Sequence, residues 1–392
     1  MPVTRRSFVA TLGASGVGII AAPLITWRGH EAAYAFQGVS ERRADRLIAS
    51  KPGMIRVDSN ENPNGPGARV FDAIRGHLNQ SNRYPVLGED ELIDAIAKAQ
   101  GVKAENVILG CGSGEVLRAA VQAFTSPTRG LVSPEPTFEA PANFAKFLGH
   151  PVLSPPVDAK LRLDLDAMRD AARDAGLVYF CNSNNPTATV HSKADVASFI
   201  DQVNRLSPDT VVLIDEAYHE YVESPAYGSV IPLALANPRV IVARTFSKVF
   251  GMAGLRVGYL IGQPETLKKV SAWVLGSNVN QLALVAARTA IGDAQHIADE
   301  QRKNRDARAF TRAYFEQAGY TVHAAEANFL MVDIHRDAKE FKTACAKRMV
   351  AIGRKFPSLP TYARVSVGTM PEMKKAVETF RAVLSAAATP SR

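Results

Sequence analysis

The sequence predicts an α/β fold, in which a parallel or mixed sheet is covered by helices and a smaller α+β domain follows. Three observations predict it. The chain has 392 residues, more than one ordinary core accommodates, so two domains are expected. Five short apolar runs between residues 107 and 244 lack alternation with polar residues, which is typical of strands buried on both faces. Segments of helical periodicity separate these runs, and the last hundred residues show a different pattern.

The composition is that of a globular protein. Hydrophobic residues make up 46% and charged residues 21%, which argues against disorder and against a polytopic membrane protein. The formal net charge is +8, but the basic residues are scattered. We therefore expect a solvated basic surface and no nucleic-acid partner. Three cysteines and unclustered histidines indicate neither a disulfide framework nor a metal site.

The N-terminus has the features of an export signal. Residues Thr4–Val9 include the pair Arg5-Arg6, a weakly apolar stretch follows to Trp27, and Ala33-Tyr34-Ala35 offers a cleavage site. A membrane anchor is the alternative, but glycines and a proline interrupt the apolar stretch. Residues 1–35 are therefore predicted to be a twin-arginine signal peptide. The mature protein would begin near Phe36 and be periplasmic or otherwise exported, with the membrane involved only through export.

The next segment, residues 36–67, is loop-rich and predicted to be an N-terminal arm. Residues 68–290 are predicted to form the large domain. Its expected strands are Val107–Gly110, Gly130–Ser133, Leu177–Asn182, Val211–Asp215 and Val240–Arg244. Its clearest expected helices are Glu115–Phe124, Ala194–Asn204 and Pro264–Leu275.

The C-terminal residues 291–392 are predicted to form the small α+β domain. A long polar helix is expected from about Asp293 to Gly319. Strands are expected at Tyr320–His323, Phe329–Ile334 and Ala363–Val367, with helices between and after them.

Polar residues follow the predicted strands of the large domain, at the sheet edge where open α/β proteins bind ligands. The first strand leads into the glycine-rich turn Gly110–Glu115 at a helix N-terminus, which suits a phosphate. Later strands end in Asn182–Thr187, Asp215–Tyr218 and Thr245–Lys248, and Arg256 follows.

Each of these residues alone has an ordinary structural explanation. Asn185-Pro186 is usually a turn, Asp215 a helix cap or a metal-site residue, Lys248 a surface charge and Arg256 an ion-pair member. Together they supply the chemistry that pyridoxal 5'-phosphate requires, namely a lysine amine, an acid for the ring nitrogen, donors to the ring hydroxyl and a phosphate cradle. In that order, these groups are Lys248; Asp215; Asn185 with Tyr218; and Ser113 and Gly114 with Ser247 and Arg256.

On these motifs the sequence resembles the fold-type-I aminotransferases, and among them the histidinol-phosphate aminotransferase branch. The resemblance covers roughly residues 52–385. Further matching segments are Asn60–Pro63, Arg83–Pro85, Pro136–Phe138, Ala327–Phe329 and Arg364–Thr369. The resemblance implies a mixed, mostly parallel seven-stranded sheet sandwiched by helices, with a smaller α+β domain, and pyridoxal 5'-phosphate as cofactor.

The resemblance also implies a role for each cofactor-binding residue. Lys248 would form the Schiff base and carry the proton, with Asp215 and Tyr218 as its catalytic partners. Asp215 would pair with the ring nitrogen, and Phe138, where relatives often carry Tyr, would stack on the ring. The ring oxygen would be bound by Asn185 and Tyr218, and the phosphate by Ser113, Gly114, Ser247 and Arg256, with Thr245 assisting.

For substrates, the resemblance implies that Arg364 clamps the α-carboxylate, with Asn60 nearby. Arg354 would contact an anionic substrate side chain. Tyr84 would reach the phosphate of a neighbouring subunit, which predicts a homodimer with shared active sites.

The predicted function is transfer of an amino group between an L-amino acid, or an amine like histidinol phosphate, and a 2-oxo acid. Two alternatives stay open from the sequence. One is a different pyridoxal-phosphate reaction, carried out by an amino-acid oxidase, a decarboxylase or a racemase, since a fold does not fix a reaction. The other is a non-catalytic protein that binds the cofactor.

Overall fold

The computed structural model describes residues 45, 47–323 and 325–386. Residues Ile55–Arg392 form one compact unit, which holds every predicted site residue. The predicted signal peptide, residues 1–35, lies outside the described residues. Within the described part of the chain, no helix is both long and apolar enough to cross a membrane.

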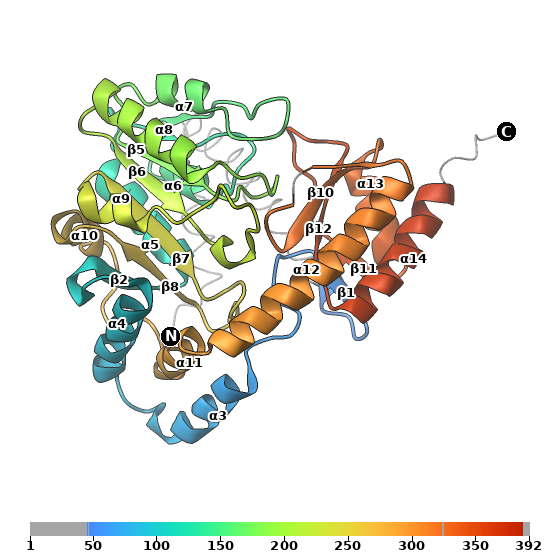
Figure 1. The fold of residues 1–392 in the computed structure, drawn as a ribbon, viewed down its shortest axis with the longest axis horizontal. Helices are drawn as coiled ribbons and strands as arrows, with labels where there is room; N and C mark the ends of the chain where they lie inside the picture. The colour runs from blue at the N-terminus through green and yellow to red at the C-terminus, as the bar shows by residue number, and fades with distance from the viewer. Residues whose placement is uncertain (1–44, 46, 324, 387–392) are drawn as a thin grey trace, which may run out of the picture. The chain divides into compact units, whose positions relative to one another are not determined.

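A seven-stranded sheet forms the centre of this unit (Figure 1). In chain order its strands are β2 (Val107–Cys111), β3 (Leu131–Val132), β4 (Val152–Leu153), β5 (Leu177–Cys181), β6 (Val211–Asp215), β7 (Val240–Thr245) and β8 (Val257–Ile261). Their spatial order is β2-β8-β7-β6-β5-β3-β4. Only β8 runs antiparallel to its neighbours within this sheet. The predicted fold class, a mixed and mostly parallel seven-stranded sheet, is confirmed.

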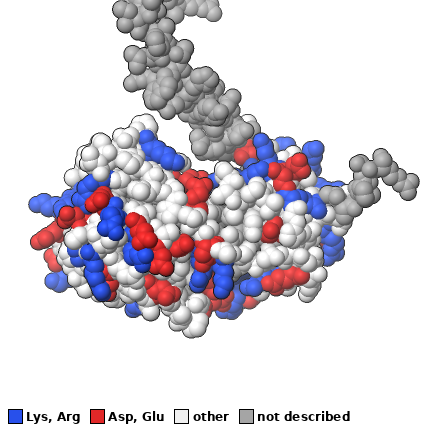
Figure 2. Space-filling model, turned by 90° about the horizontal axis from the view of Figure 1, so that it is seen from above, with Lys and Arg blue, Asp and Glu red and all other residues white. Residues whose placement is uncertain are grey.

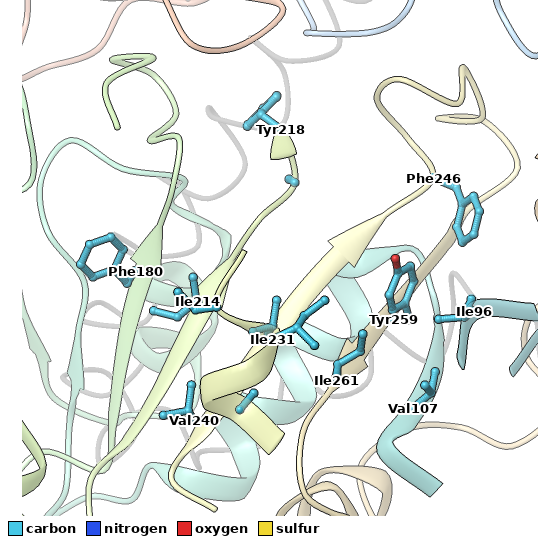
Figure 3. Packing of buried hydrophobic residues seen from close by; sticks show 14 of the residues in the cluster. Ile96, Val107, Phe180, Ile214, Tyr218, Ile231, Val240, Phe246, Tyr259 and Ile261 are labelled. Carbon is cyan, nitrogen blue, oxygen red and sulfur yellow. The ribbon is translucent and has the colours of Figure 1, made fainter. Parts of the chain in front are cut away.

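The central strands are buried on both faces, as their continuous apolar runs predicted. Every residue of β5, β6, β7 and β8 is buried. Along β5, Val178 and Phe180 belong to one hydrophobic core and Leu177 and Tyr179 to the other. Figure 3 shows Phe180 and Ile214 alongside their strands and Tyr218 beyond the strand ends. The successive side chains thus pack into layers on opposite sides of the sheet.

Helices supply both layers. One core includes residues of α4 (Val86–Gln100), α8 (Lys193–Leu206), α9 (Ile231–Ala236) and α11 (Gln281–Ile291). The other includes residues of α5 (Ser113–Phe124), α6 (Ala140–Phe147) and α10 (Pro264–Ser271). The remaining helices of this part of the chain are α3 (Ala68–His77), α7 (Leu165–Ala171) and the short 3-10 helices η1 (Leu78–Gln80), η2 (Ala104–Asn106) and η3 (His219–Tyr221).

Local sequence signals explain where several helices start and stop. At α8, the Ser192 side chain accepts from the Asp195 backbone N–H, and the Asp195 side chain accepts from the Ser192 backbone N–H. This reciprocal pair is a capping box. The helix predicted at Pro264–Leu275 ends earlier, at Ser271. Trp273 and Leu275 beyond it are exposed, so they have no apolar face with which to continue the helix.

The C-terminal part contains a separate hydrophobic core around a three-stranded antiparallel sheet of order β12-β10-β9. The elements are the long helix α12 (Ala294–Gln317), β9 (Thr321–Val322), β10 (Phe329–Asp333), α13 (Ala338–Ala346), β12 (Tyr362–Ser366) and α14 (Met370–Ala386). The predicted polar helix and all three predicted strands are present there. The domain boundaries at residues 67 and 290 stay a prediction.

Four strands were not predicted. β1 (Ile55–Val57) lies in the segment expected to be loop, and it pairs in parallel with β11 (Val350–Ile352). This pairing joins residues almost three hundred positions apart, which no local pattern reveals. In the main sheet, β4 has only two residues, and β8 begins directly after Arg256, a residue expected at the cofactor phosphate.

The surface carries charges of both signs. On the face seen in Figure 2, basic and acidic side chains are intermixed, with uncharged residues between them. Many form short-range ion pairs, such as Arg312 with Glu316 at 2.7 Å and Arg302 with Asp299 at 3.1 Å. The net charge is therefore spread over a mixed surface on this face.

Candidate active site

The predicted site residues meet at the carboxyl ends of β5, β6 and β7. Asn185 follows β5, Tyr218 follows β6 and Lys248 follows β7. Because these strands are parallel, the segments after them emerge at one edge of the sheet. Two further segments complete the site: the arm around Asn60 and strand β12, which carries Arg364.

Lys248 is enclosed by this cluster. Its Nζ donates a hydrogen bond to the Asn60 carbonyl oxygen at 3.0 Å and lies 5.3 Å from the centre of the Tyr218 ring. Burial, followed by the nearby charge of Arg364, lowers the pKa of the Lys248 ammonium to about 8. About a tenth of the side chains are then neutral at pH 7, and the neutral fraction rises toward one half as the pH approaches 8. An uncharged amine is the form that attacks a carbonyl carbon.

Asp215, the last residue of β6, is 3% exposed. Its Oδ2 accepts a hydrogen bond from the Tyr179 hydroxyl at 2.7 Å, and its Oδ1 accepts from the Ala217 backbone N–H at 3.1 Å. Burial raises the pKa of Asp215 to about 6, and the hydrogen bond from Tyr179 opposes that rise. The charged form of such a carboxylate is strongly favoured by a cationic partner, as a protonated ring nitrogen would be.

Asn60 ties the arm to both sides of the site. Its Nδ2 donates to the Tyr218 hydroxyl at 3.2 Å, and its Oδ1 accepts from the Ser366 hydroxyl at 2.7 Å. Asn328 Nδ2 donates to the Asn60 carbonyl at 3.0 Å. Asn60 has a φ of 54°, in the left-handed region that asparagine tolerates better than most residues. The arm is therefore fixed where the predicted catalytic lysine can bond to it.

Arg364 is held by two hydrogen bonds from its guanidinium and keeps one guanidinium donor unused. Its Nη1 donates to Asn185 Oδ1 at 2.8 Å and its Nη2 to the Asp58 carbonyl at 2.9 Å. Its Nε is buried and has no hydrogen-bond partner among the described residues. Burial lowers the pKa of Arg364 from its usual value. A buried guanidinium with a free N–H is a binding group for a carboxylate.

The predicted phosphate-binding residues form an adjacent group. Ser247 Oγ accepts hydrogen bonds from Thr245 Oγ1 at 3.0 Å and from Arg256 Nη1 at 3.4 Å. Ser113 and Gly114 begin helix α5, whose first N–H groups have no intrahelical acceptor. These hydroxyl, guanidinium and backbone donors are the kind that hold a phosphate at a helix N-terminus.

Two glycines keep this cradle open. A Cβ at Gly112, where φ is +76°, would lie 2.2 Å from Arg256 Nη2. A Cβ at Gly258 would lie 2.2 Å from the Ser113 nitrogen. Glu115, in the same turn, accepts from the Cys111 backbone N–H at 2.6 Å and from Asn278. Glu115 thus fastens the turn rather than facing a ligand.

Three predicted residues are not joined to this cluster by any hydrogen bond or ion pair among the described residues. Tyr84 is 87% exposed. Phe138 is half-buried and packs against the apolar core of α5 and α6. Arg354 is partly exposed, forms an ion pair with Glu139 and lies over the ring of Phe356.

Sequence reasoning missed the partners that fix the predicted residues. Tyr179 faces Asp215 because Cys181 pairs with Asp215 in the strand register, so Tyr179 lies on the same face two residues away. A tyrosine inside an otherwise apolar buried strand is a usable signal, since a buried hydroxyl needs a partner. Ser366 and Asn328 lay within recognised motifs but had no assigned role.

A buried ion pair between Arg244 and Glu216 lies at the end of β6. Arg244 Nη2 and Glu216 Oε2 are 2.7 Å apart, and both side chains are almost fully buried. Glu216 also accepts from Ser229 and from the Val230 backbone, so its lone pairs are used. This pair stands next to Asp215 in sequence, yet it is saturated with protein partners and offers nothing to a ligand.

The donor set fits pyridoxal phosphate. It combines a buried amine, a buried carboxylate and hydroxyl and amide groups with a phosphate cradle that a Cβ at Gly112 would fill. The residues that would hold the cofactor are Lys248, Asp215, Tyr218 and Asn185, with Ser113, Gly114, Ser247 and Arg256 at the phosphate.

Comparison with known proteins agrees with this chemistry. Residues 52–380 match the family model "Aminotransferase class I and II". The chain is 35% identical to a histidinol-phosphate aminotransferase of Symbiobacterium thermophilum, over 84% of this chain and 91% of that protein. It is 36% identical to an aromatic amino acid aminotransferase of Rhodococcus jostii, over 77% of this chain and 83% of that protein.

Among solved structures, one similar chain is the histidinol-phosphate aminotransferase of Sinorhizobium meliloti in complex with pyridoxal-5'-phosphate. It has a TM-score of 0.81 at 24% identity, with 88% of this chain and 95% of that chain covered. The comparisons support amino transfer and not the alternative reactions considered from the sequence. The chain belongs to the class I and II aminotransferases, a family of pyridoxal-phosphate-dependent enzymes.

Proposed function

We propose that this aminotransferase transfers an amino group between an L-amino acid and a 2-oxo acid, with Lys248 as the lysine that binds the cofactor and carries the proton. The observation that supports this role most directly is the set of contacts around Lys248, whose half-buried side chain donates to the Asn60 carbonyl and whose pKa is lowered to about 8. Burial removes competing water, and the lowered pKa supplies the neutral amine.

Each neighbour then has a task defined by its contacts. Pyridoxal phosphate, when bound, supplies a conjugated ring that accepts the electron pair released at the substrate α-carbon. Asp215, held by Tyr179, would pair with the ring nitrogen and supply the negative charge that favours its protonated form. Tyr218, beside the lysine, and Asn185, bonded to Arg364, would bind the ring oxygen, and Lys248 would carry the proton of the substrate α-carbon at its Nζ.

Arg364 is assigned to the substrate α-carboxylate. Its unpartnered Nε and its position against Asn185 place a free N–H next to the cofactor-binding residues. A bidentate guanidinium–carboxylate pair fixes orientation as well as charge. Orientation matters because a substrate held in one geometry brings its reacting atoms to the catalytic groups without a further entropic cost.

The substrate class is narrowed by the relatives. The named relatives include histidinol-phosphate aminotransferases and aromatic amino acid aminotransferases at similar identity. We infer that the amino donor is an L-amino acid with an aromatic ring or an amine related to histidinol phosphate.

A substrate screen tests the proposal. Purified holoenzyme would be mixed with single amino acids and with histidinol phosphate, and the cofactor absorbance followed without a 2-oxo acid. Conversion to the aminated cofactor, reversed by added 2-oxo acid, is the expected result. Turnover that consumes oxygen, or that continues without a 2-oxo acid, would contradict the proposal.

We also propose a homodimer with shared active sites. Five large apolar side chains on or between η1, α3 and α4 are exposed, including Tyr84 at 87% and Leu87 at 77%. Exposed apolar side chains of this number are typical of an interface. Light scattering after size-exclusion chromatography should give twice the mass of one chain, and a monomer at micromolar concentration would refute the dimer.

Export is the remaining proposal, and it rests on the twin-arginine motif and the Ala33-Tyr34-Ala35 site. Sequencing of the protein recovered from the periplasm should give an N-terminus near Phe36. Recovery of full-length protein from the cytoplasm alone would exclude export.

A further inference from the structure

We propose that Glu139 determines substrate specificity. Glu139 forms an ion pair with Arg354, so Arg354 is occupied and Arg364 alone binds the substrate anion. The site would then select α-amino acids whose only anion is the carboxylate and whose side chain is uncharged, in preference to doubly charged amines such as a phosphate ester. This inference rests on the proposed function, since it assigns Arg364 to the α-carboxylate.

Two arginines share one aromatic ring at this side of the site. The guanidinium carbon of Arg354 lies 4.2 Å from the centre of the Phe356 ring, and that of Arg364 lies 5.5 Å from the same centre. Arg364 is tied inward to Asn185. Arg354 instead forms an ion pair with the Glu139 carboxylate. Around this ring, Arg364, the inner arginine, keeps an unpartnered Nε, whereas Arg354, the outer arginine, is already paired.

The charges of the outer pair oppose each other at Arg364. After burial, the next influences on its pKa are Tyr218, which raises it, and Arg354, which lowers it, followed by Glu139, which raises it. Without Glu139 the two arginines would present two positive charges to a ligand. With Glu139 in place, a second negative charge on the ligand must compete with the Glu139 carboxylate for Arg354. The same carboxylate also repels that second charge.

Phe356 is itself buried, in a small hydrophobic cluster with Leu161, Met331 and Leu359. On the inner side, Arg364 lies 5.8 Å from the centre of the Phe329 ring. The aromatic side chains next to the two arginines carry no charge, so they leave the balance of charge between Arg354 and Glu139 unaltered.

The expected effect is modest, because both members of the pair are partly exposed. The Arg354 and Glu139 side chains retain 42% and 44% of their accessible surface. Exposed ion pairs contribute little, so the ratio of activities should change by about two- to fivefold.

The test uses holoenzyme with the substitution Glu139→Gln, which keeps the size of the side chain and removes its charge. The kcat/KM for phenylalanine would be compared with that for histidinol phosphate and for glutamate. Equilibrium binding of 3-phenylpropionate, with one negative charge, and glutarate, with two, would be measured by calorimetry. Glu135→Gln is the matched control, since Glu135 is an exposed carboxylate four residues earlier.

The proposal predicts that Glu139→Gln raises kcat/KM for the doubly charged substrates, relative to phenylalanine, by about two- to fivefold, and strengthens glutarate binding. The Glu135→Gln protein should keep the wild-type ratio. An unchanged or reversed ratio in Glu139→Gln, or the same change in both variants, overturns the role of Glu139. Failure of the wild-type holoenzyme to aminate any 2-oxo acid would refute the proposed function instead, so the two failures are distinguishable.

Discussion

The inner and outer parts of the candidate site use charge in different ways. In the inner part, Lys248 and Asp215 are enclosed, and burial shifts the pKa of each toward neutrality. In the outer part, Arg354 and Glu139 pair with each other while partly exposed to solvent. The same kinds of side chain are therefore reactive in one region and compensated in the other.

The comparison teaches that burial, rather than residue type, decides what a charge can do. A buried charge loses hydration, so its pKa and its interactions respond strongly to a few neighbours. A charge near the surface is screened by water and ions, so its pairing with another charge alters the preference among substrates more than the reaction rate. Inner substitutions should therefore change chemistry and outer substitutions should change selectivity.

The largest expected effect is at Lys248. Replacing Lys248 with Ala removes both the amine that binds the cofactor and the group that carries the proton, so kcat should fall by about 10⁴-fold or more. The absorbance of the lysine-bound cofactor should disappear as well. Lys269→Ala, at an exposed position, is the control. Retention of the wild-type spectrum in the Lys248 variant would show that another residue binds the cofactor.

Arg364→Lys should have the next largest effect. Lysine keeps the positive charge but lacks the planar fork that matches a carboxylate, so kcat/KM should fall by about 10²-fold. The cofactor spectrum without substrate should stay close to wild type, because Arg364 is assigned to substrate. Arg348→Lys, on the exposed surface, should behave as wild type. A lost cofactor spectrum together with unchanged KM would place Arg364 with the cofactor.

Asp215→Asn tests the inner region without turnover. Because burial raises the pKa of Asp215 to about 6, the folded cofactor-free protein holds this proton more tightly than the unfolded chain. The stability that protonated Asp215 provides is present below about pH 4 and is lost as pH rises through about 6. The variant, which does not titrate there, should gain up to about 3 kcal/mol over wild type at pH 8.

Urea unfolding of cofactor-free protein at pH 4, 6 and 8 measures this difference, which should be near zero at pH 4. Asp209→Asn, at an exposed position, serves as control. If the difference were equally large at pH 4 and pH 8, the effect would not come from the titration of Asp215.

The smallest predicted effect is at Tyr179. Replacing it with Phe removes the 2.7 Å hydrogen bond to Asp215, which favours the charged carboxylate. The acid limb of the kcat profile should therefore move to higher pH, and kcat should fall by about five- to tenfold. Tyr259→Phe removes another buried hydroxyl of the same sheet and is the matched control. Equal shifts in both variants would indicate a general loss of stability.

Much of the inner site could be predicted from sequence because its residues follow strands in recognisable motifs. Asp215, Tyr218 and Lys248 stand within a few residues of apolar strand ends, and parallel strands bring those ends to one edge. The outer site could not be predicted in this way. Glu139 and Arg354 are separated by 215 positions, and no periodicity links them.

The sequence by itself determined the sheet, most of its strands and the cofactor chemistry, and it predicted Lys248 as the cofactor-binding lysine, because these depend on local patterns of burial and on residue types within short motifs. Only the tertiary structure decided which groups neutralise, orient or expose those residues: Tyr179 on Asp215, Asn60 on Lys248 and Glu139 on Arg354. The reason is physical. Electrostatic effects depend on distance and burial, and contacts between distant segments of the chain create both only when the chain has folded.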